Sequence, residues 1–304
     1  MSTIPTIIDE YVDFLRRHRA LAEDSIRVIL RHVTPFLLHL GDQAQPSRLK
    51  EVSPGVVHRF VVARAESQKR TGKRAVCFAM RSFLRYASMR GYVGHDILDA
   101  VPRIPTYALA GLPRALPWAD VMKILEAIGR STVTGPRDYA ILLLLATYGL
   151  RVGEVARMTL GDIDWRHDRL TIPHRKADVS LVLPLTPEVG EAMVTYLRES
   201  RPRVAHRQVF LGVKRPHRPF STKNCAGLRV LVKKRMLRAG VDARLAFPHA
   251  LRHSLASRML QQGQPMKAIA DVLGHASLQS TAIYAKVDIE HLRGVALDLP
   301  EVRP

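Results

Sequence analysis

The chain has 304 residues, of which 47% are hydrophobic, and this composition excludes an intrinsically disordered protein and allows two domains of ordinary size. The longest purely apolar run, residues 140–146, is too short to cross a bilayer, and acidic side chains in the first apolar segment exclude a secretory signal. Only Cys77 and Cys225 are present, so we expect no disulfide framework, no zinc site and a cytoplasmic location.

The formal net charge of +20 implies a polyanionic partner, and nucleic acid is the usual one. An anionic membrane surface is the alternative. The basic residues are spread over the whole chain, however, which favours nucleic acid.

Four helices are predicted in the first ninety residues. Apolar residues recur with helical spacing over residues 7–17 and 25–40, and Gly41 ends the second segment. Ser53 and Pro54 supply an N-cap and a first-turn proline for a helix through Arg64. A fourth helix is predicted over residues 70–90. Together these segments predict a small all-helical bundle.

One face of the helix predicted over residues 70–90 is basic. At 100° per residue its four arginines lie within about 60° of each other, opposite an apolar face. A solvated charged face is the alternative interpretation, but the absence of acids favours a face that follows DNA phosphates. The predicted DNA contacts are Arg70, Arg74, Arg81 and Arg85.

Prolines and a glycine punctuate residues 98–117, which indicates an interdomain linker. We therefore expect a helical domain over 1–101, a linker over 102–117 and a second domain over 118–304. The second domain is predicted to be helical with a small sheet. Helices are expected at 119–128, 137–148, 150–158 and 187–198, and strands at 163–165, 169–172 and 180–185.

Residues 201–240 contain twelve Lys or Arg and no acid, which favours DNA contact over a merely solvated surface. The second half of this block is predicted to be a helix with Leu228, Leu231, Val232 and Leu237 inside. Its outward residues include the predicted DNA contacts Arg229, Lys233 and Lys234. Further helices are expected over 248–262, 266–273, 277–284 and 289–297.

The C-terminal part of the chain concentrates side chains suited to phosphate chemistry. Arginines bind phosphate through paired N–H groups, imidazoles donate hydrogen bonds or accept a proton, and a tyrosine is a nucleophile that needs such help. A metal site at His249 and His253 is the alternative, but neither Glu nor Cys lies nearby to complete it. The set is His249, Arg252, His275 and Tyr284, with Arg151 upstream.

The motifs around these residues resemble those of the tyrosine recombinase (phage integrase) family. Residues 146–154, ATYGLRVGE, resemble its first arginine box, and residues 249–253, HALRH, resemble its H-x-L-R-H box. Residues 273–277, LGHAS, and the Ile283-Tyr284 pair resemble its L-G-H and nucleophile boxes. The resemblance covers nearly the whole chain and implies a SAM-like core-binding domain followed by an α+β catalytic domain.

The resemblance implies a role for each matched residue. Tyr284 would attack the scissile phosphate and form a 3′-phosphotyrosyl link, while Arg151 and Arg252 hold the phosphate. His249 would accept a proton or contact the phosphate, and His275 would donate a hydrogen bond in the transition state.

The general acid implied by the family is a lysine in a β-hairpin turn, a position that Lys176 occupies here. The turn departs from the family's usual G-K-G-N-K, and the neighbouring Arg175 is a rival cation. Glu154 lies one turn after Arg151 and either orients it or is a surface acid.

The expected activity is therefore that of a site-specific DNA recombinase of the integrase or transposase type. Because one phosphoester is exchanged for another, neither a nucleotide, a metal nor another cofactor is expected. By resemblance, the expected partners are double-stranded DNA and three further copies of the chain in a tetramer on two DNA sites, with other recombinases as further candidates. A type IB topoisomerase-like enzyme and a catalytically idle DNA-binding accessory protein are the alternatives.

Overall fold

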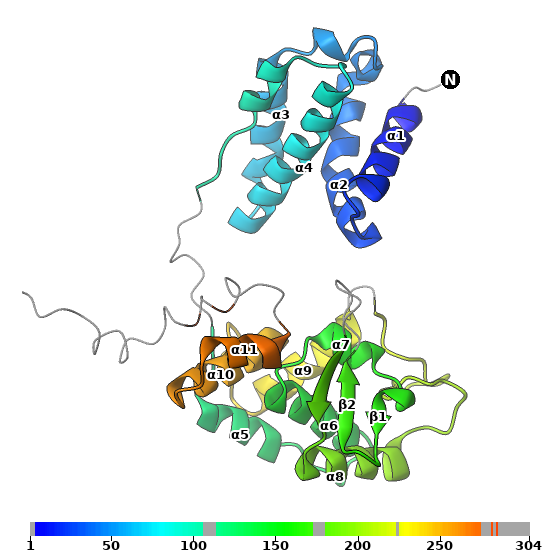
Figure 1. Ribbon diagram of the computed structural model, residues 1–304, viewed down its shortest axis with the longest axis vertical. Helices are drawn as coiled ribbons and strands as arrows, with labels where there is room; N and C mark the ends of the chain where they lie inside the picture. Colours follow the sequence, from blue (N-terminus) through cyan, green and yellow to red (C-terminus); the bar gives the residue numbers. More distant parts are fainter. Residues whose placement is uncertain are drawn as a thin grey trace, which may run out of the picture. The chain divides into compact units, whose positions relative to one another are not determined.

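The computed structural model describes residues 4–105, 114–172, 180–222 and 225–274, together with Thr281 and Tyr284. The chain divides into two compact units, Met1–Ala108 and Leu109–Pro304. Each unit, drawn as a ribbon in Figure 1, has its own hydrophobic core of buried side chains. The domain limits predicted from the sequence, at residues 101 and 118, stay predictions.

The N-terminal unit is a bundle of four helices: α1 (Ile4–Arg17), α2 (Glu23–Leu40), α3 (Pro54–Glu66) and α4 (Arg70–Met89). The apolar spacing of α2 explains its packing, because residues such as Ile26, Val33 and Leu37 are buried. Gly41 follows α2 with φ of 56°, a left-handed conformation that favours glycine. Short 3₁₀ helices follow at Gly41–Ala44, Leu49–Glu51 and His95–Ala100.

The proline-rich segment 98–117 is structured at its start, before the linker predicted over 102–117. Residues 98–100 belong to the 3₁₀ helix His95–Ala100, whose Ile97 is buried and whose Leu98 packs against the N-terminal core. A six-residue 3₁₀ helix is too short to give a periodic apolar pattern, so the sequence alone did not indicate it.

The C-terminal unit is built around α6 (Gly135–Thr147), which is buried on every side from Gly135 to Ala146, as its unbroken leucine run predicts. The other helices are α5 (Trp118–Glu126), α7 (Val152–Arg157), α8 (Pro187–Thr195), α9 (Ala226–Arg238), α10 (Pro248–Gln261) and α11 (Met266–Leu273). A 3₁₀ helix, Leu160–Asp162, precedes the sheet, and α8 continues into a π-helical turn, Tyr196–Ser200. Figure 1 shows α10 and α11 on the opposite side of this unit from the sheet.

The small sheet has the order β1 (Ile163–Asp164), β2 (Arg169–Ile172), β3 (Leu181–Pro184), with antiparallel pairing throughout. Leu170 pairs with Leu183, and both side chains are buried in the core. The Tyr148 hydroxyl donates a hydrogen bond to the Pro184 carbonyl at 2.7 Å, which fixes β3 to the end of α6.

A buried ion network attaches α9 to α6. The Asp138 carboxylate accepts hydrogen bonds from Arg137 at 2.7 Å and from Arg235 at 2.6 Å, and all three side chains are largely buried. Arg201 donates to the carbonyls of residues 206, 208 and 209. Two arginines of the acid-free segment 201–240, Arg201 and Arg235, therefore stabilise the fold.

The inward face predicted for the helix now called α9 was wrong at one position. Leu237 is 41% exposed, and Met236 is buried in its place beside Leu228 and Val232. The outward positions were predicted correctly, since Arg229, Lys233 and Lys234 are exposed. Within the described residues, the structure contains no helix that is both long and apolar enough to span a membrane.

Candidate active site

Arg151 stands at the N-cap of α7, directly after the turn at Gly149 and Leu150. The buried Glu154 carboxylate accepts a hydrogen bond from the Arg151 backbone N–H at 2.7 Å and another from Arg151 Nη1 at 2.9 Å. The Arg151 side chain remains 40% exposed. Glu154 therefore holds a partly open guanidinium in place and is not a surface acid.

Arg252 lies on α10 and is 5% exposed. Its guanidinium donates to the Gly149 carbonyl at 2.6 Å and to the Leu273 carbonyl at the end of α11. Gly149 has φ of 60°, and a Cβ there would lie 2.7 Å from Leu273 Cδ2. A glycine at this turn thus lets the first arginine box approach α10 and α11 closely.

The positive charges of Arg151 and Arg252 favour the binding of an anion between them. Burial and the nearby charge of Arg151 lower the pKa of Arg252 to about 10, an effect that Glu154 and Tyr284 partly offset. Arg252 remains charged at neutral pH, so two cations face one carboxylate. A phosphodiester beside them would relieve their mutual repulsion.

Tyr284 is buried, at 2% exposed, and its hydroxyl lies 2.9 Å from His253 Nδ1. Burial raises the pKa of the phenol, while the charges of Arg252 and Arg151 act in the opposite direction. The tyrosine is therefore close enough to both arginines to sense their charge. Activation of its hydroxyl needs a proton acceptor.

The contact between His253 and Tyr284 was not predicted from the sequence. His249 and His253 are four residues apart on α10, with ring centroids 6.4 Å apart, so periodicity alone gave no reason to prefer either one. Burial and the charges of His249 and Arg252 lower the pKa of His253 to about 4. The ring is therefore neutral at pH 7 in the chain alone, and a phosphate beside Arg252 would offset the positive charge that lowers this pKa and make the ring a better proton acceptor.

His249 is the more exposed of the two histidines. Desolvation lowers its pKa, and the charges of Arg252, Arg229 and Arg151 add to the effect. The Arg229 side chain of α9 is thus part of the electrostatic surroundings of the site. His249 also stays neutral at pH 7.

The structure brings together four of the six predicted catalytic residues: Arg151, His249, Arg252 and Tyr284. Lys176, its rival Arg175 and His275 lie outside the described residues. The described part of the chain contains no group of three or more His, Cys, Asp or Glu residues placed to hold a metal ion.

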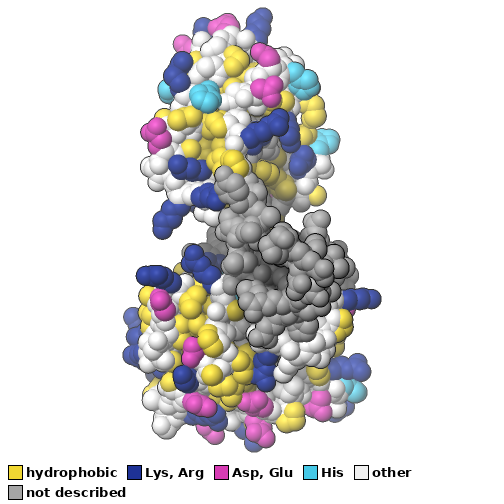
Figure 2. Space-filling model, turned by 90° about the vertical axis from the view of Figure 1, so that its left-hand side faces the viewer, with side chains coloured by type: hydrophobic (Ala, Val, Ile, Leu, Met, Phe, Trp, Pro, Cys, Tyr) yellow, Lys and Arg dark blue, Asp and Glu magenta, His cyan; other side chains and the backbone are white. Residues whose placement is uncertain are grey.

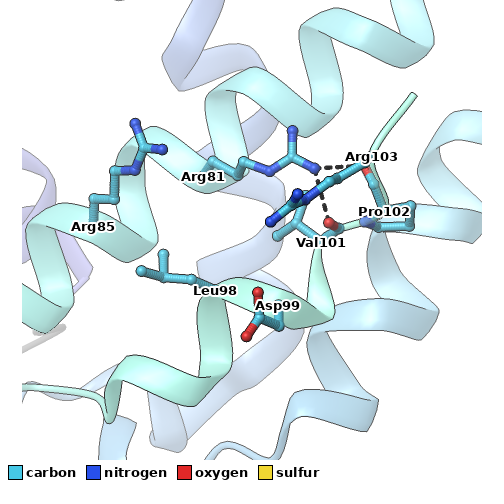
Figure 3. A pocket seen from close by; sticks show the side chains of 7 residues that line it. All are labelled: Arg81, Arg85, Leu98, Asp99, Val101, Pro102 and Arg103. Carbon is cyan, nitrogen blue, oxygen red and sulfur yellow. Dashed lines mark hydrogen bonds between the residues drawn. The ribbon is translucent and has the colours of Figure 1, made fainter. Parts of the chain in front are cut away.

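The four arginines predicted on α4 differ in their surroundings. Arg81 donates to the carbonyls of Val101 at 2.9 Å and Pro102 at 2.7 Å, and Arg70 donates to Pro105 at 2.8 Å. Figure 3 shows the Arg81 guanidinium turned toward this segment and Arg85 pointing away from it. Arg74 and Arg85 are exposed.

Arg81 and Arg85 border a hollow of about 460 Å³ that Arg103 and Asp99 also line. Figure 2 shows Lys and Arg side chains on the viewed face of each unit. The arginines of α4 are therefore divided between fixing residues 101–105 and facing solvent.

Comparison with known proteins agrees with the motifs. Residues 115–291 match the model of the phage integrase family, and residues 8–91 match that of the phage integrase N-terminal SAM-like domain. The chain is 38% identical to a Sinorhizobium fredii protein named "Putative integrase/recombinase y4rA", over 97% of this chain and 72% of that protein. It is 27% identical to the tyrosine recombinase XerD of Listeria monocytogenes, over 95% and 96% of the two chains.

The fold is also shared with solved structures. A lambda integrase tetramer bound to a Holliday junction matches with a TM-score of 0.69 and 16% identity, over 99% of this chain and 80% of that one. The mostly helical fold with a small sheet, predicted from the sequence, is confirmed. The chain belongs to the phage integrase family of tyrosine recombinases, enzymes that break and rejoin DNA through a phosphotyrosine intermediate.

Proposed function

We propose that this chain is a site-specific DNA recombinase whose nucleophile is Tyr284. One observation carries the proposal: a buried tyrosine hydroxyl lies 2.9 Å from a neutral imidazole, within the field of two arginines. A tyrosine that served only the core would need no paired cations, and a protein that only occupied DNA would need no such hydroxyl.

The proposed step exchanges one phosphoester for another. Tyr284 Oη attacks the scissile phosphorus, the P–O5′ bond breaks, and a 3′-phosphotyrosyl link and a free 5′-hydroxyl result. The phenol proton passes to His253 Nδ1, the acceptor within reach. Lys176 is proposed to give a proton to the departing O5′, so the proton count balances.

The cations stabilise the charge that develops at phosphorus. Arg151 and Arg252 bind the non-bridging oxygens, and the fixed contacts of both guanidinium groups reduce the reorganisation needed during reaction. His249 and His275 are proposed as hydrogen-bond donors to the same oxygens. Because the phosphotyrosyl bond conserves the energy of the phosphodiester, the scheme uses neither a nucleotide nor a metal.

The proposed partner is double-stranded DNA, and the proposed assembly is a homotetramer on two DNA sites, with other recombinases as alternative partners. The shared fold with a tetrameric integrase on a Holliday junction supports this assembly. The basic charge supports a cytoplasmic, nucleoid-associated location.

Covalent trapping tests the nucleophile. The wild-type chain is incubated with nicked or sheared genomic DNA, and adducts are separated in denaturing gels and their attached ends sequenced. Tyr284→Phe should bind DNA but give no adduct. Tyr139→Phe, another largely buried tyrosine, is the matched control and should give adducts at the wild-type level. Adducts of Tyr284→Phe would exclude Tyr284 as nucleophile, and supercoil relaxation without exchange between two sites would indicate a topoisomerase instead.

A substrate with a 5′-bridging phosphorothiolate tests the general acid. Its sulfur leaves without protonation, so this substrate should restore cleavage by Lys176→Ala but not by Tyr284→Phe. The Arg175→Ala variant provides the comparison, because the two cations are adjacent. Rescue of Arg175→Ala instead of Lys176→Ala would transfer the acid role to Arg175.

A further inference from the structure

The outward face of α4 carries an exposed aromatic side chain among cations. Phe78 is 60% exposed, although α4 has a well-formed inner face that buries Val76, Met80 and Phe83. The exposed ring therefore takes no part in the core of the N-terminal unit. Leaving so much apolar surface in water costs free energy that a binding partner can recover.

The neighbours of Phe78 on this face are basic. Arg74 lies four residues before it and Arg85 seven residues after it, so helical spacing places all three on one side of α4. The twenty residues of α4 contain neither Asp nor Glu. A partner for this face must therefore combine apolar groups with negative charge.

Arg74 and Arg85 are available to such a partner. Their side chains are exposed, and neither guanidinium has a hydrogen bond or ion pair with another residue in the described part of the chain. Arg81, on the same face, is occupied by the carbonyls of Val101 and Pro102. The Phe78 face thus has an apolar centre with a cation toward each end.

The major groove of DNA offers the matching surface. It admits an α-helix, it is bordered by phosphates, and its apolar feature is the 5-methyl group of thymine, which Phe contacts in known complexes. We propose that Phe78 reads a thymine methyl group in the major groove, while Arg74 and Arg85 bind phosphates or guanine edges beside it. This inference rests on the proposed function and adds a residue that determines which sites the recombinase accepts.

Removal of the thymine methyl group tests the contact directly. A high-affinity duplex is first selected by the wild-type chain from random-sequence DNA. Each thymine is then replaced singly by deoxyuridine, which removes only the 5-methyl group, and dissociation constants are measured by fluorescence anisotropy at one salt concentration. Wild type should lose about threefold to tenfold in affinity at one or two thymines.

Phe78→Ala should bind the unmodified duplex about as weakly as wild type binds the duplex in which the contacted thymine is replaced by deoxyuridine. The same replacement should not weaken DNA binding by Phe78→Ala any further. Phe78→Leu, which keeps an apolar side chain, should retain part of the deoxyuridine effect. Val133→Ala, at a residue 83% exposed in the other unit, is the matched control and should behave as wild type. Circular dichroism should be the same for all variants.

Either of two results would overturn the inference alone: wild type binds DNA but no deoxyuridine weakens its binding, or Phe78→Ala shows the same deoxyuridine profile as wild type. If the second result came with a failure of Phe78→Ala to assemble on two-site DNA, this face would be a protein interface. Failure of the wild-type chain to bind any duplex would overturn the proposed function as well.

Discussion

The arginines of the candidate active site and the exposed arginines of α4 are held in opposite ways. In the catalytic unit Arg252 is 5% exposed and is bound to two backbone carbonyls, and Arg151 is held by a buried carboxylate. On α4 of the N-terminal unit, Arg74 and Arg85 extend into solvent. Catalysis requires charges fixed before the substrate arrives, whereas contacts along a duplex allow side chains that adjust to the backbone they meet.

This difference also explains why removing a buried arginine and removing an exposed arginine should affect the stability of the protein differently. Removal of a buried, saturated arginine leaves its acceptors unpaired, while removal of an exposed one leaves only a shorter side chain. Four experiments address the contrast, beginning with the largest expected effect.

Arg252→Ala should abolish covalent adduct formation and lower the free energy of unfolding by about 2–4 kcal/mol, because the carbonyls of Gly149 and Leu273 lose a charged donor. Urea denaturation at pH 7 measures the stability. Arg74→Ala, on the exposed face of α4, is the control and should be as stable as wild type. An Arg252→Ala variant with wild-type stability would show that these contacts do not support the fold.

Gly149→Ala should lower the free energy of unfolding by roughly 1–3 kcal/mol and reduce cleavage, since it combines a left-handed φ of 60° with a close approach to Leu273. Gly91→Ala is the matched control in the N-terminal unit. Its φ is 71°, but an added Cβ there meets nothing within 4 Å. The difference in the free energy of unfolding between the two variants measures the cost of packing a Cβ against Leu273. Equal losses in both variants would show that the site has no such packing requirement.

The pH dependence of stability should identify His253 as a partly buried imidazole that is neutral at pH 7. Its pKa is about 4 in the folded chain, below the ordinary 6.5, so the unfolded state binds the proton first as pH falls. Stability from this group is present above about pH 6.5 and is lost between pH 6.5 and 4; the full shift corresponds to roughly 3 kcal/mol, which partial solvent exposure of the ring reduces to on the order of 1–2 kcal/mol.

His253→Gln removes this contribution, so the variant should lose less stability than wild type between pH 7 and 5 in urea titrations. Comparison with the variant is needed because His249 and His32 also have lowered pKa values and the same sign of effect. Identical pH profiles for wild type and variant would contradict the assignment.

Arg85→Ala should have the smallest effect. DNA affinity should fall a few-fold for all sequences, the slope of log affinity against log salt should decrease by about 1, and the melting temperature should stay unchanged. Anisotropy titrations from about 50 to 200 mM salt measure the slope. Lys50→Ala removes one positive charge from an exposed residue of the same unit outside α4, so it controls for net charge and should decrease the slope less than Arg85→Ala does. An unchanged slope for Arg85→Ala would remove it from the DNA contacts.

The sequence was most informative where the signal is local. The helices of both units follow from apolar spacing, and the buried α6 follows from its leucine run, because a helical face repeats every few residues. The site motifs were also local, since each box spans a few residues. Leu237 shows the limit of such reasoning: it was placed inside α9, but the adjacent Met236 faces the core.

The sequence by itself determined which residue types the site holds and in what order, because short motifs carry that information without any long-range contact. Only the tertiary structure decided their partners. It placed the Tyr284 hydroxyl beside His253 although His249 lies one turn away, buried Glu154 beneath Arg151, and let Arg70 and Arg81 donate to carbonyls of residues 101–105. These contacts depend on packing between segments that are distant in sequence, so they cannot be predicted from the periodicity within one helix.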